Sequence, residues 1–264
     1  MRQFGKDPVG EAIALAAPQT LAAKATQDWL RMAVLAVLAG TFIAFGSVIS
    51  LVVQSGIGDG PTPGPVLVLS GLAFSVGLVL VMVAGAELFT GNTMMVLPAV
   101  TGALGLPRMI AAWCVVWVGN LAGSVALALL FAGAGGLDGS VGEAARSVAG
   151  DKLAKAPMTV FCSGILANAL VCLAVWMSMN AVSLPARILA IVGPITLFVA
   201  AGLEHSVANM SLIPMGWLSS MADGVDGSAG LLNLAFSTAG NIVGGSLLAL
   251  SLAYGHDALK PGSP

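Results

Sequence analysis

Long apolar stretches separated by short polar connectors make up most of this chain. Six of the stretches are long enough for an α-helix to cross about 30 Å of hydrocarbon, which takes roughly 20 residues. They cover residues 30–53, 66–101, 109–133, 157–180, 186–219 and 229–255. Glycine, proline and charged residues are concentrated in the connectors, as is typical of turns. The pattern predicts an all-α integral membrane protein with six transmembrane helices.

The segment before the first apolar stretch has a different character. Residues 8–31 are rich in alanine and include Lys24, Asp28, Trp29 and Arg31. Such a mixture suits the boundary between water and lipid, so we expect a helix lying along the membrane surface. The chain is accordingly divided into an N-terminal cytoplasmic or interfacial segment (1–29), a six-helix transmembrane domain (30–255) and a short cytoplasmic tail (256–264).

The distribution of positive charge predicts how the helices are oriented. When the connectors are assigned alternately to the two sides, seven of the ten lysines and arginines fall on the side of the termini. The other three are Arg146, Lys152 and Lys155. Because basic residues are retained on the cytoplasmic side, both termini are predicted to be cytoplasmic.

Composition supports the membrane assignment and excludes other classes of protein. Charged residues are 8% of the chain, against about 25% in soluble domains, which rules out an ordinary water-soluble enzyme. A net charge of -2 offers no positive field for nucleic acid. The three cysteines, Cys114, Cys162 and Cys172, lie within apolar stretches and are predicted to be small buried hydrophobic residues rather than a disulfide or metal set.

The two longest stretches share a motif. Residues 84–92 and 201–209 align at an offset of 117 and have Ala, Gly, Glu and Asn in common. Residues 119–124 and 240–245, both beginning Gly-Asn and having Gly four positions on, align at an offset of 121. Chance similarity between glycine-rich helices is the alternative to a duplication of three helices. Because three is odd, a duplicated half would enter the membrane from the opposite face, giving an inverted 3+3 repeat with interrupted second and fifth helices.

Away from the ends of the apolar stretches, three residues can carry a charge near neutral pH, namely Glu87, Glu204 and His205. Placing a charge there costs roughly 2.5–3.5 kcal/mol on insertion scales, so a function is expected of them. For Glu87 we expect a structural role, accepting backbone N–H groups exposed by a helix break. His205 is the functional candidate, with a packing role as the alternative, whereas His256 beside Asp257 is expected to be solvated.

Three polar residues lie close to these groups in the sequence. Thr90 either presents its hydroxyl to a permeating species or bonds to nearby backbone. Asn92 and Asn209 occupy equivalent positions and are expected to cap the resumed half-helices. No metal-ligand spacing, phosphate-binding loop or nucleophile motif occurs, so no cofactor, metal site or catalytic residue is predicted.

Four ordered motifs resemble those of the formate/nitrite transporter family. They lie at residues 82–91, 164–174, 202–210 and 240–245, and Ala169 stands where a larger apolar residue is usual in the second. The resemblance spans roughly residues 25–255. It implies a homopentamer of aquaporin-like protomers in the cell inner (plasma) membrane, each with its own narrow pore, and no enzymatic activity.

The resemblance also implies a substrate class, small monovalent anions such as formate, nitrite or hydrosulfide, together with protons. Residues 213–216 after the histidine motif look more like formate members of the family, and formate is preferred here. Two alternatives from other classes remain: a neutral-solute channel of aquaporin type, and a haem-holding membrane anchor. The former lacks paired Asn-Pro-Ala segments, and the latter needs a second intramembrane histidine.

Carried over by motif position, the resemblance assigns roles to individual residues. Thr90 faces the central His205, and Glu204 and Asn209 belong to the same substrate pathway. Lys152 lies near the outer vestibule, although Lys155 fits that role as well. The implied pore constriction consists of Leu88 and Phe89 beside Thr90, of Val171, and of Phe74, Leu78 and Phe198 placed by spacing.

An apolar constriction rejects a bare anion, because moving a charge out of water without a partner is expensive. We therefore predict that Lys152 concentrates the anion and that His205 with Thr90 receives it. The histidine either neutralises the anion electrostatically or gives it a proton, so that flux depends on pH. Replacing Phe89 with alanine is expected to admit larger carboxylates.

Overall fold

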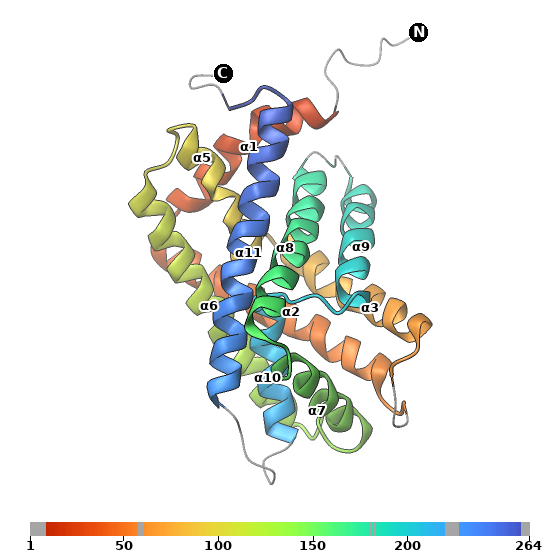
Figure 1. Cartoon of the computed structure of the whole chain (residues 1–264). Coiled ribbons are helices and arrows are strands. Elements are labelled where there is room, and N and C mark those ends of the chain that lie inside the picture. Colours follow the sequence, from red (N-terminus) through yellow and green to blue (C-terminus); the bar gives the residue numbers. More distant parts are fainter. Residues whose placement is uncertain (1–8, 58–60, 180, 182, 220–226, 260–264) are drawn as a thin grey trace.

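The computed structural model describes residues 9–57, 61–179, 181, 183–219 and 227–259, and every regular element in these ranges is helical (Figure 1). The elements are α1 (Val9–Thr26), α2 (Trp29–Gln54), α3 (Gly64–Ala84), α4 (Phe89–Asn92), η1 (Thr93–Met95), α5 (Val96–Val100), α6 (Leu106–Gly133), α7 (Ser140–Leu153), α8 (Pro157–Met179), α9 (Leu184–Ala200), α10 (Ser206–Ser219) and α11 (Gly227–Gly255). The connectors predicted at 58–60 and 223–226 and the end of the tail lie outside the described residues.

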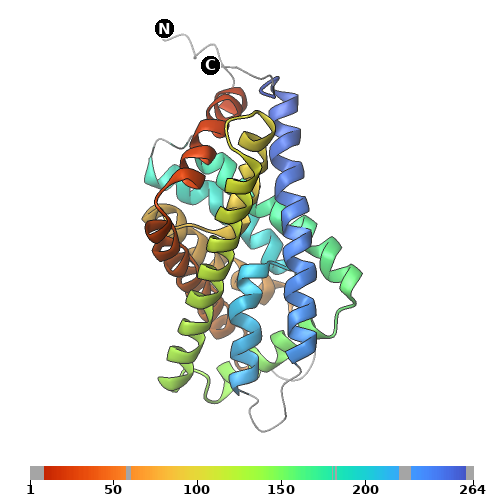
Figure 2. The same ribbon diagram turned by 90° about the vertical axis from the view of Figure 1, so that its left-hand side faces the viewer.

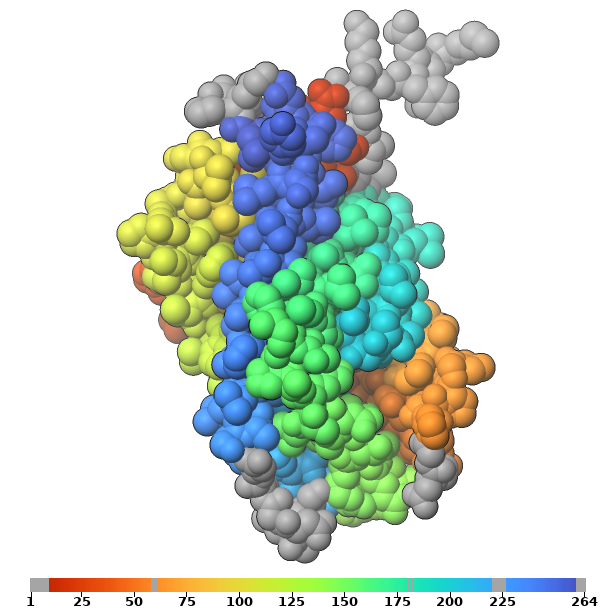
Figure 3. Space-filling view, viewed as in Figure 1, coloured from red at the N-terminus to blue at the C-terminus, as the bar shows by residue number. Residues whose placement is uncertain are grey.

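Among the residues that the structure describes, five helices have the length and apolar composition needed to cross a membrane: α2, α3, α6, α8 and α11. Helix α9, with 17 residues, is apolar but shorter. Figure 3 shows α11 along the outer surface, flanked by α6 and α8. Large apolar side chains on these helices, including Leu130, Leu166 and Leu247, are exposed on the single chain. A surface of this kind suits lipid, and the chain is a multi-pass membrane protein.

The two longest apolar stretches do not fold as single helices. Helix α3 ends at Ala84, and Gly85 adopts a left-handed conformation with φ of 69° before α4 begins. Helix α9 ends at Ala200, and Gly202, with φ of 62°, lies in the segment before α10. Glycine has no Cβ and adopts this conformation at little cost, which explains why a glycine follows each helix end.

Glycines also bring pairs of long helices into close contact. A Cβ at Gly40 or Gly123 would collide with the backbone of the facing helix in the α2–α6 pair. Gly240 and Gly244 have the same relationship to α8. The small-residue motifs at 119–124 and 240–245 therefore lie at two comparable helix interfaces, the arrangement by which membrane helices gain van der Waals contact.

The N-terminal helix packs against the bundle rather than only lying along the membrane surface. Helix α1 contacts α5 and η1, and its residues Ile13, Ala17 and Leu21 are buried. Figures 1 and 2 show α1 at the end of the molecule that also carries the C-terminus. The Arg108 guanidinium fastens the junction to α2 by donating to the carbonyls of Ala25 and Gln27, at 2.7 Å each.

Two further expectations differ from the structure. The connector at 135–156 contains the helix α7, which packs on α10, and Gly216 permits the approach because a Cβ there would collide with Ala149. Burial was expected of all three cysteines; Cys172 is buried, but Cys114 and Cys162 are exposed. Their exposure is the consequence of the apolar outer surface of spanning helices, where a small hydrophobic residue need not be inside.

Candidate functional site

The centre of the site is a contact between residues at the two helix breaks. Nε2 of His205 lies 2.9 Å from Oγ1 of Thr90, and both residues are buried. His205 immediately precedes α10, and Thr90 lies in the short helix α4. The structure thus brings together the two residues that the sequence assigned to the middle of the pathway.

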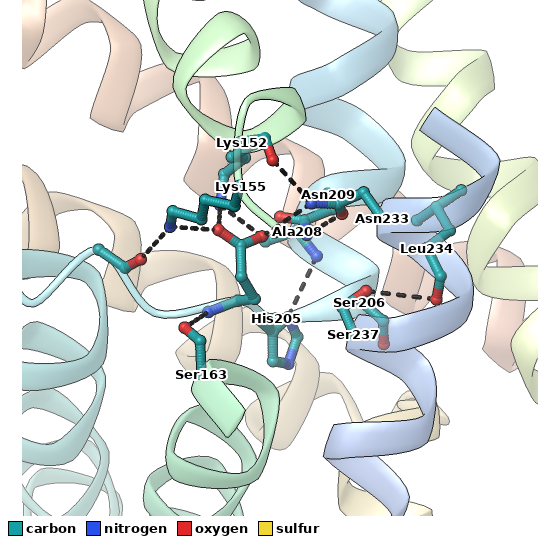
Figure 4. Close-up of polar contacts among 12 residues, drawn as sticks. Lys152, Lys155, Ser163, His205, Ser206, Ala208, Asn209, Asn233, Leu234 and Ser237 are labelled. Carbon is teal, nitrogen blue, oxygen red and sulfur yellow. Dashed lines mark hydrogen bonds and ion pairs between the residues drawn. The ribbon is translucent and has the colours of Figure 1, made fainter. Parts of the chain in front are cut away.

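Backbone geometry around His205 fixes which ring nitrogen carries hydrogen. The N–H of Ala208 donates to Nδ1 of His205 over 3.1 Å, a contact drawn in Figure 4. Nδ1 must therefore be without hydrogen, and in the neutral ring the hydrogen is on Nε2. This nitrogen faces Thr90, so the ring offers an N–H donor at the point where the two segments meet.

An asparagine from a neighbouring long helix holds the segment before α10 in place. Oδ1 of Asn241 accepts from the N–H of Ser206 at 2.8 Å. Its Nδ2 donates to the carbonyl of Glu204 at 3.0 Å and to that of Gly164 at 2.8 Å. Polar backbone groups that a helix break exposes inside a membrane need such partners.

Asn120 does the same for the segment before α4. It accepts from the N–H of Phe89 at 2.8 Å and donates to the carbonyls of Glu87 and Ala36 at 2.9 and 2.8 Å. The expectation that the Glu87 side chain would accept from the exposed amides is therefore wrong: the N–H of Phe89 donates to Asn120, and the Glu87 carboxylate binds side chains. In the sequence Asn120 and Asn241 are marked only by the Gly-Asn motifs at 119–124 and 240–245.

The Glu204 carboxylate is fully buried and surrounded by donors, of which Figure 4 labels Lys152, Lys155, Asn209 and Asn233. Nζ of Lys155 lies 2.6 Å from Oε1, and Nζ of Lys152 lies 3.3 Å from Oε2. Asn209 donates to Oε2 at 2.6 Å, and Asn233 from α11 lies 3.4 Å away. Both lysines, between which the sequence did not decide, therefore contact the same carboxylate.

The Glu87 carboxylate is held in the same manner by other elements. Nζ of Lys24 lies 3.1 Å from its Oε2, Nε2 of Gln27 lies 3.0 Å from its Oε1, and Asn92 donates to Oε2 at 2.9 Å. Asn92 and Asn209 thus bond to a glutamate five residues earlier instead of capping a helix, which corrects the expectation for both.

The two clusters correspond contact by contact. Lys24 and Lys152 are 128 positions apart in the sequence, and so are Gln27 and Lys155. Lys24 binds Oε2 of Glu87, and Lys152 binds Oε2 of Glu204. Gln27 binds Oε1 of Glu87, and Lys155 binds Oε1 of Glu204. One chemical difference remains, a neutral glutamine in place of a lysine. The equal spacing was the signal that would have identified Lys24 and Gln27 from the sequence.

Electrostatics distinguish the two clusters as well. The Glu204 cluster contains two lysines for one carboxylate, whereas the Glu87 cluster contains one. Burial lowers the pKa of Lys152 from its usual value, and nearby Lys155 acts in the same direction, while Glu204 opposes the shift. Burial therefore disfavours the charged form of Lys152, and the carboxylates of Glu204 and Asp151 favour it.

Two cavities approach the centre from opposite ends of the molecule. One, of about 260 Å³, lies against α1 and is lined by Lys24, Leu88 and Arg187 among others. The other, of about 450 Å³, lies near α7 and is lined by Lys152 and Lys155 among others. Figure 1 shows α1 and α7 at opposite ends. Neither cavity is lined by His205 or Thr90, which lie between them in the chain's buried interior.

The residues expected to form the constriction are distributed around this centre. The rings of Phe74 and Phe198 are 5.6 Å apart in a T-shaped contact, both line the cavity near α7, and Phe198 lies 5.5 Å from the His205 ring. Leu88 lines the cavity against α1. The other three, Leu78, Phe89 and Val171, are buried and line neither cavity.

Phe89 has a packing partner of its own. Its ring lies 6.4 Å from that of Trp113 on α6 in an edge-on contact.

The described part of the chain contains no group of three His, Cys, Asp or Glu side chains able to hold a metal ion. The arrangement is therefore a buried pair of hydrogen-bonding groups reached through apolar walls from two charged openings.

Comparison with known proteins gives one consistent result. The family model described as Formate/nitrite transporter matches residues 11–255. The formate channel FocA of Escherichia coli (strain K12) is 34% identical, with 92% of each chain covered. The nitrite transporter NirC of the same strain is also 34% identical, with 86% of this chain and 83% of the relative covered. A solved pentameric formate channel with formate bound superimposes with a TM-score of 0.80 at 32% identity, covering 88% of this chain and 98% of that one.

Proposed function

This chain belongs to the formate/nitrite transporter family, and we propose that it is a pH-dependent channel for small monovalent anions, with formate as its substrate. The observation that carries the proposal is the position of the His205–Thr90 pair between two cavities, each bordered by lysine. Lysine lies at both openings, and a pair of hydrogen-bonding groups in the interior gives a desolvated anion partners.

We propose that residues 30–255 form the channel domain, with six spans arranged as an inverted repeat. In this arrangement α3 to α5 form a broken second span, and α9 with α10 a broken fifth span. The matching clusters of Glu87 and Glu204, and the matching ties from Asn120 and Asn241, support it. Interrupted helices of two inverted halves are a common way for transporters to form a site near the bilayer midplane.

The proposed route begins at the cavity near α7. Lys152 and Lys155 line this cavity together with Asp151, and both ammonium groups are available to an entering anion beside the buried Glu204 carboxylate. The anion then passes Phe74 and Phe198, loses water and reaches His205. Leaving toward α1, it passes Leu88 and comes out beside Lys24.

At the centre, the Nε2–H of His205 donates a hydrogen bond to the anion together with the Thr90 hydroxyl. A ring with hydrogen on both nitrogens would direct Nδ1–H against the N–H of Ala208. The doubly protonated ring is therefore disfavoured until a negative charge stands next to it. The ring takes up a proton from water at Nδ1, the Nε2 proton moves to a carboxylate oxygen, and a neutral acid leaves. The neutral ring then carries its hydrogen on Nδ1; it loses this hydrogen and regains one at Nε2, which restores the contact with the N–H of Ala208.

The same proposal places the protein in the cell inner membrane as a homopentamer with cytoplasmic termini. The pentameric state of the solved formate channel supports the assembly. On the terminal side, Lys24, Arg31, Arg108 and Arg187 outnumber the three basic residues of the opposite side. Hydrosulfide and protons are included among the permeating species because the central pair can exchange a proton with any small basic anion.

The test is uptake into proteoliposomes containing the purified protein. Formate, nitrite and hydrosulfide are each supplied at several pH values, alone and in competition. We expect formate uptake that increases as the pH falls and that nitrite inhibits. Water or glycerol flux without anion flux would contradict the proposal and favour a neutral-solute channel, and a haem absorbance band would favour a membrane anchor.

Nitrite is the second candidate substrate, since the nitrite transporter NirC is as similar in identity as the formate channel FocA. Both anions are small and present two oxygens to the same donors. The competition experiment separates them, because the preferred anion inhibits uptake of the other at the lower concentration.

A further inference from the structure

We propose that Arg187 is an anion-binding residue in the cavity against α1, where it supplies the second positive charge that Lys155 supplies in the cavity near α7. The inference rests on the proposed function and adds to it a residue that neither motif resemblance nor repeat equivalence identifies. Its ligand class is a small planar anion with two oxygen atoms, such as formate or nitrite.

The first step is the difference between the two clusters. Gln27 stands where the repeat would place the counterpart of Lys155, so Lys24 is the one cation bound to Glu87. Lys24 and Glu87 together therefore contribute no excess positive charge on the α1 side. An anion at the α1 side therefore lacks an attracting charge unless another residue provides it.

Arg187 is placed to provide that charge. It lies in the first turn of α9, whose beginning is fixed by Ser183, the N-cap residue that accepts from Ala186 and Arg187. Its side chain lines the cavity against α1 together with Lys24 and Asn92. A residue from a third element, neither α1 nor the first broken segment, therefore adds its charge to this opening.

The Nε–H group of Arg187 has no hydrogen-bond partner among the described residues, and its nitrogen is buried. The residues that line the cavity include no aspartate or glutamate, and Arg187 takes part in none of the ion pairs between described residues. A buried N–H donor beside a cavity with no acidic wall is satisfied by an anion that enters it.

The geometry of the guanidinium determines which anions it prefers. Its planar fork donates two parallel hydrogen bonds to a group with two oxygens, which a lysine ammonium cannot do. Formate and nitrite both present such a pair, and hydrosulfide presents a single sulfur. Arg187 is therefore expected to favour formate and nitrite over hydrosulfide at this opening.

The experiment measures influx from each side in proteoliposomes sorted by the orientation of an added terminal tag, at low ionic strength. For Arg187→Gln we expect the half-saturating formate concentration from the α1 side to rise three- to tenfold, with maximal flux nearly unchanged. Influx from the α7 side keeps its wild-type half-saturation. Arg187→Lys is expected to lie between the two, and hydrosulfide influx to change less than twofold in either variant.

Arg146→Gln is the matched control, since it removes one arginine from α7 at the other end of the molecule. It should leave influx from the α1 side unchanged. If the wild type transports formate but Arg187→Gln shifts half-saturation from the α1 side by less than twofold, the inference is overturned. Absence of wild-type flux would instead overturn the proposed function. If Arg187→Gln does not assemble, Arg187→Lys is measured instead. An unchanged half-saturating formate concentration from the α1 side in that variant would show that the two hydrogen bonds of the guanidinium are not needed, and would overturn the inference.

Discussion

Nε2 of His205 and Oγ1 of Thr90 lie 2.9 Å apart although 115 residues separate them in the sequence. Each belongs to a segment in which a long apolar stretch leaves the helical conformation, and the contact forms where the two segments meet. Interrupted helices thus free two side chains to face each other in the interior. Asn120 and Asn241 satisfy the backbone that the interruptions expose.

Replacing His205 with alanine should abolish the pH dependence of formate flux while leaving the oligomer intact. The ring carries the proton in the proposed transfer, and no other ionisable side chain contacts Thr90 Oγ1 among the described residues. Flux into proteoliposomes is measured between about pH 5 and 8, the range in which histidine titrates. The other histidine gives the matched control, His256→Ala, which should retain the wild-type profile. If the pH profile of formate flux is unchanged in His205→Ala, His205 is not the proton donor.

Replacing Phe74 with alanine should admit larger carboxylates from the side near α7. Its ring meets that of Phe198 edge-on in front of His205, so its removal widens the approach. The ratio of acetate to formate flux is expected to rise severalfold. The same measurement on Phe89→Ala tests the sequence-based expectation for that residue, whose ring packs on Trp113 and lines neither cavity. A ratio that increases for Phe89→Ala and not for Phe74→Ala would reverse the assignment.

Replacing either Asn120 or Asn241 with alanine should destabilise the protein, and to a similar extent. Each substitution removes the partners of three buried backbone groups, and leaving even one unsatisfied costs about 1–3 kcal/mol. Thermal unfolding in detergent measures the effect. Asn233→Ala provides the comparison and should cost less, because the Asn233 side chain bonds one backbone group, the carbonyl of Lys152. Equal decreases in melting temperature in all three variants would contradict the proposal that Asn120 and Asn241 stabilise the helix breaks by bonding their backbone groups.

Stability should depend on pH through Lys152. Burial lowers the pKa of this lysine below its usual 10.5, so its charged form is disfavoured in the folded state. The resulting penalty is fully present below the lowered pKa and disappears as the pH rises toward 10.5. The melting temperature of the wild type relative to Lys152→Met should therefore increase from neutral pH toward about pH 10. A constant or decreasing difference would show that the pKa is not lowered.

The fold class followed from the sequence to the extent that local physics determines it. Uninterrupted apolar stretches predict spanning helices because backbone groups must be satisfied internally in lipid. The positions of Gly85 and Gly202 are compatible with interruptions, but where each helix resumes depends on Asn120 and Asn241, which come from distant parts of the chain. For the same reason α7 was not predicted, since its stabilising contact with Gly216 is not local.

The sequence by itself determined that the chain is a membrane protein, that Glu87, Glu204 and His205 are exceptional within it, and that its motifs are those of one family. Each of these conclusions depends on residue type and spacing along the chain. Only the tertiary structure decided which donors surround each glutamate, that Lys24 and Gln27 belong to a cluster, and that Arg187 lines a cavity with an uncommitted N–H. Such facts depend on distances between segments far apart in sequence, and those distances are fixed by the packing of whole helices.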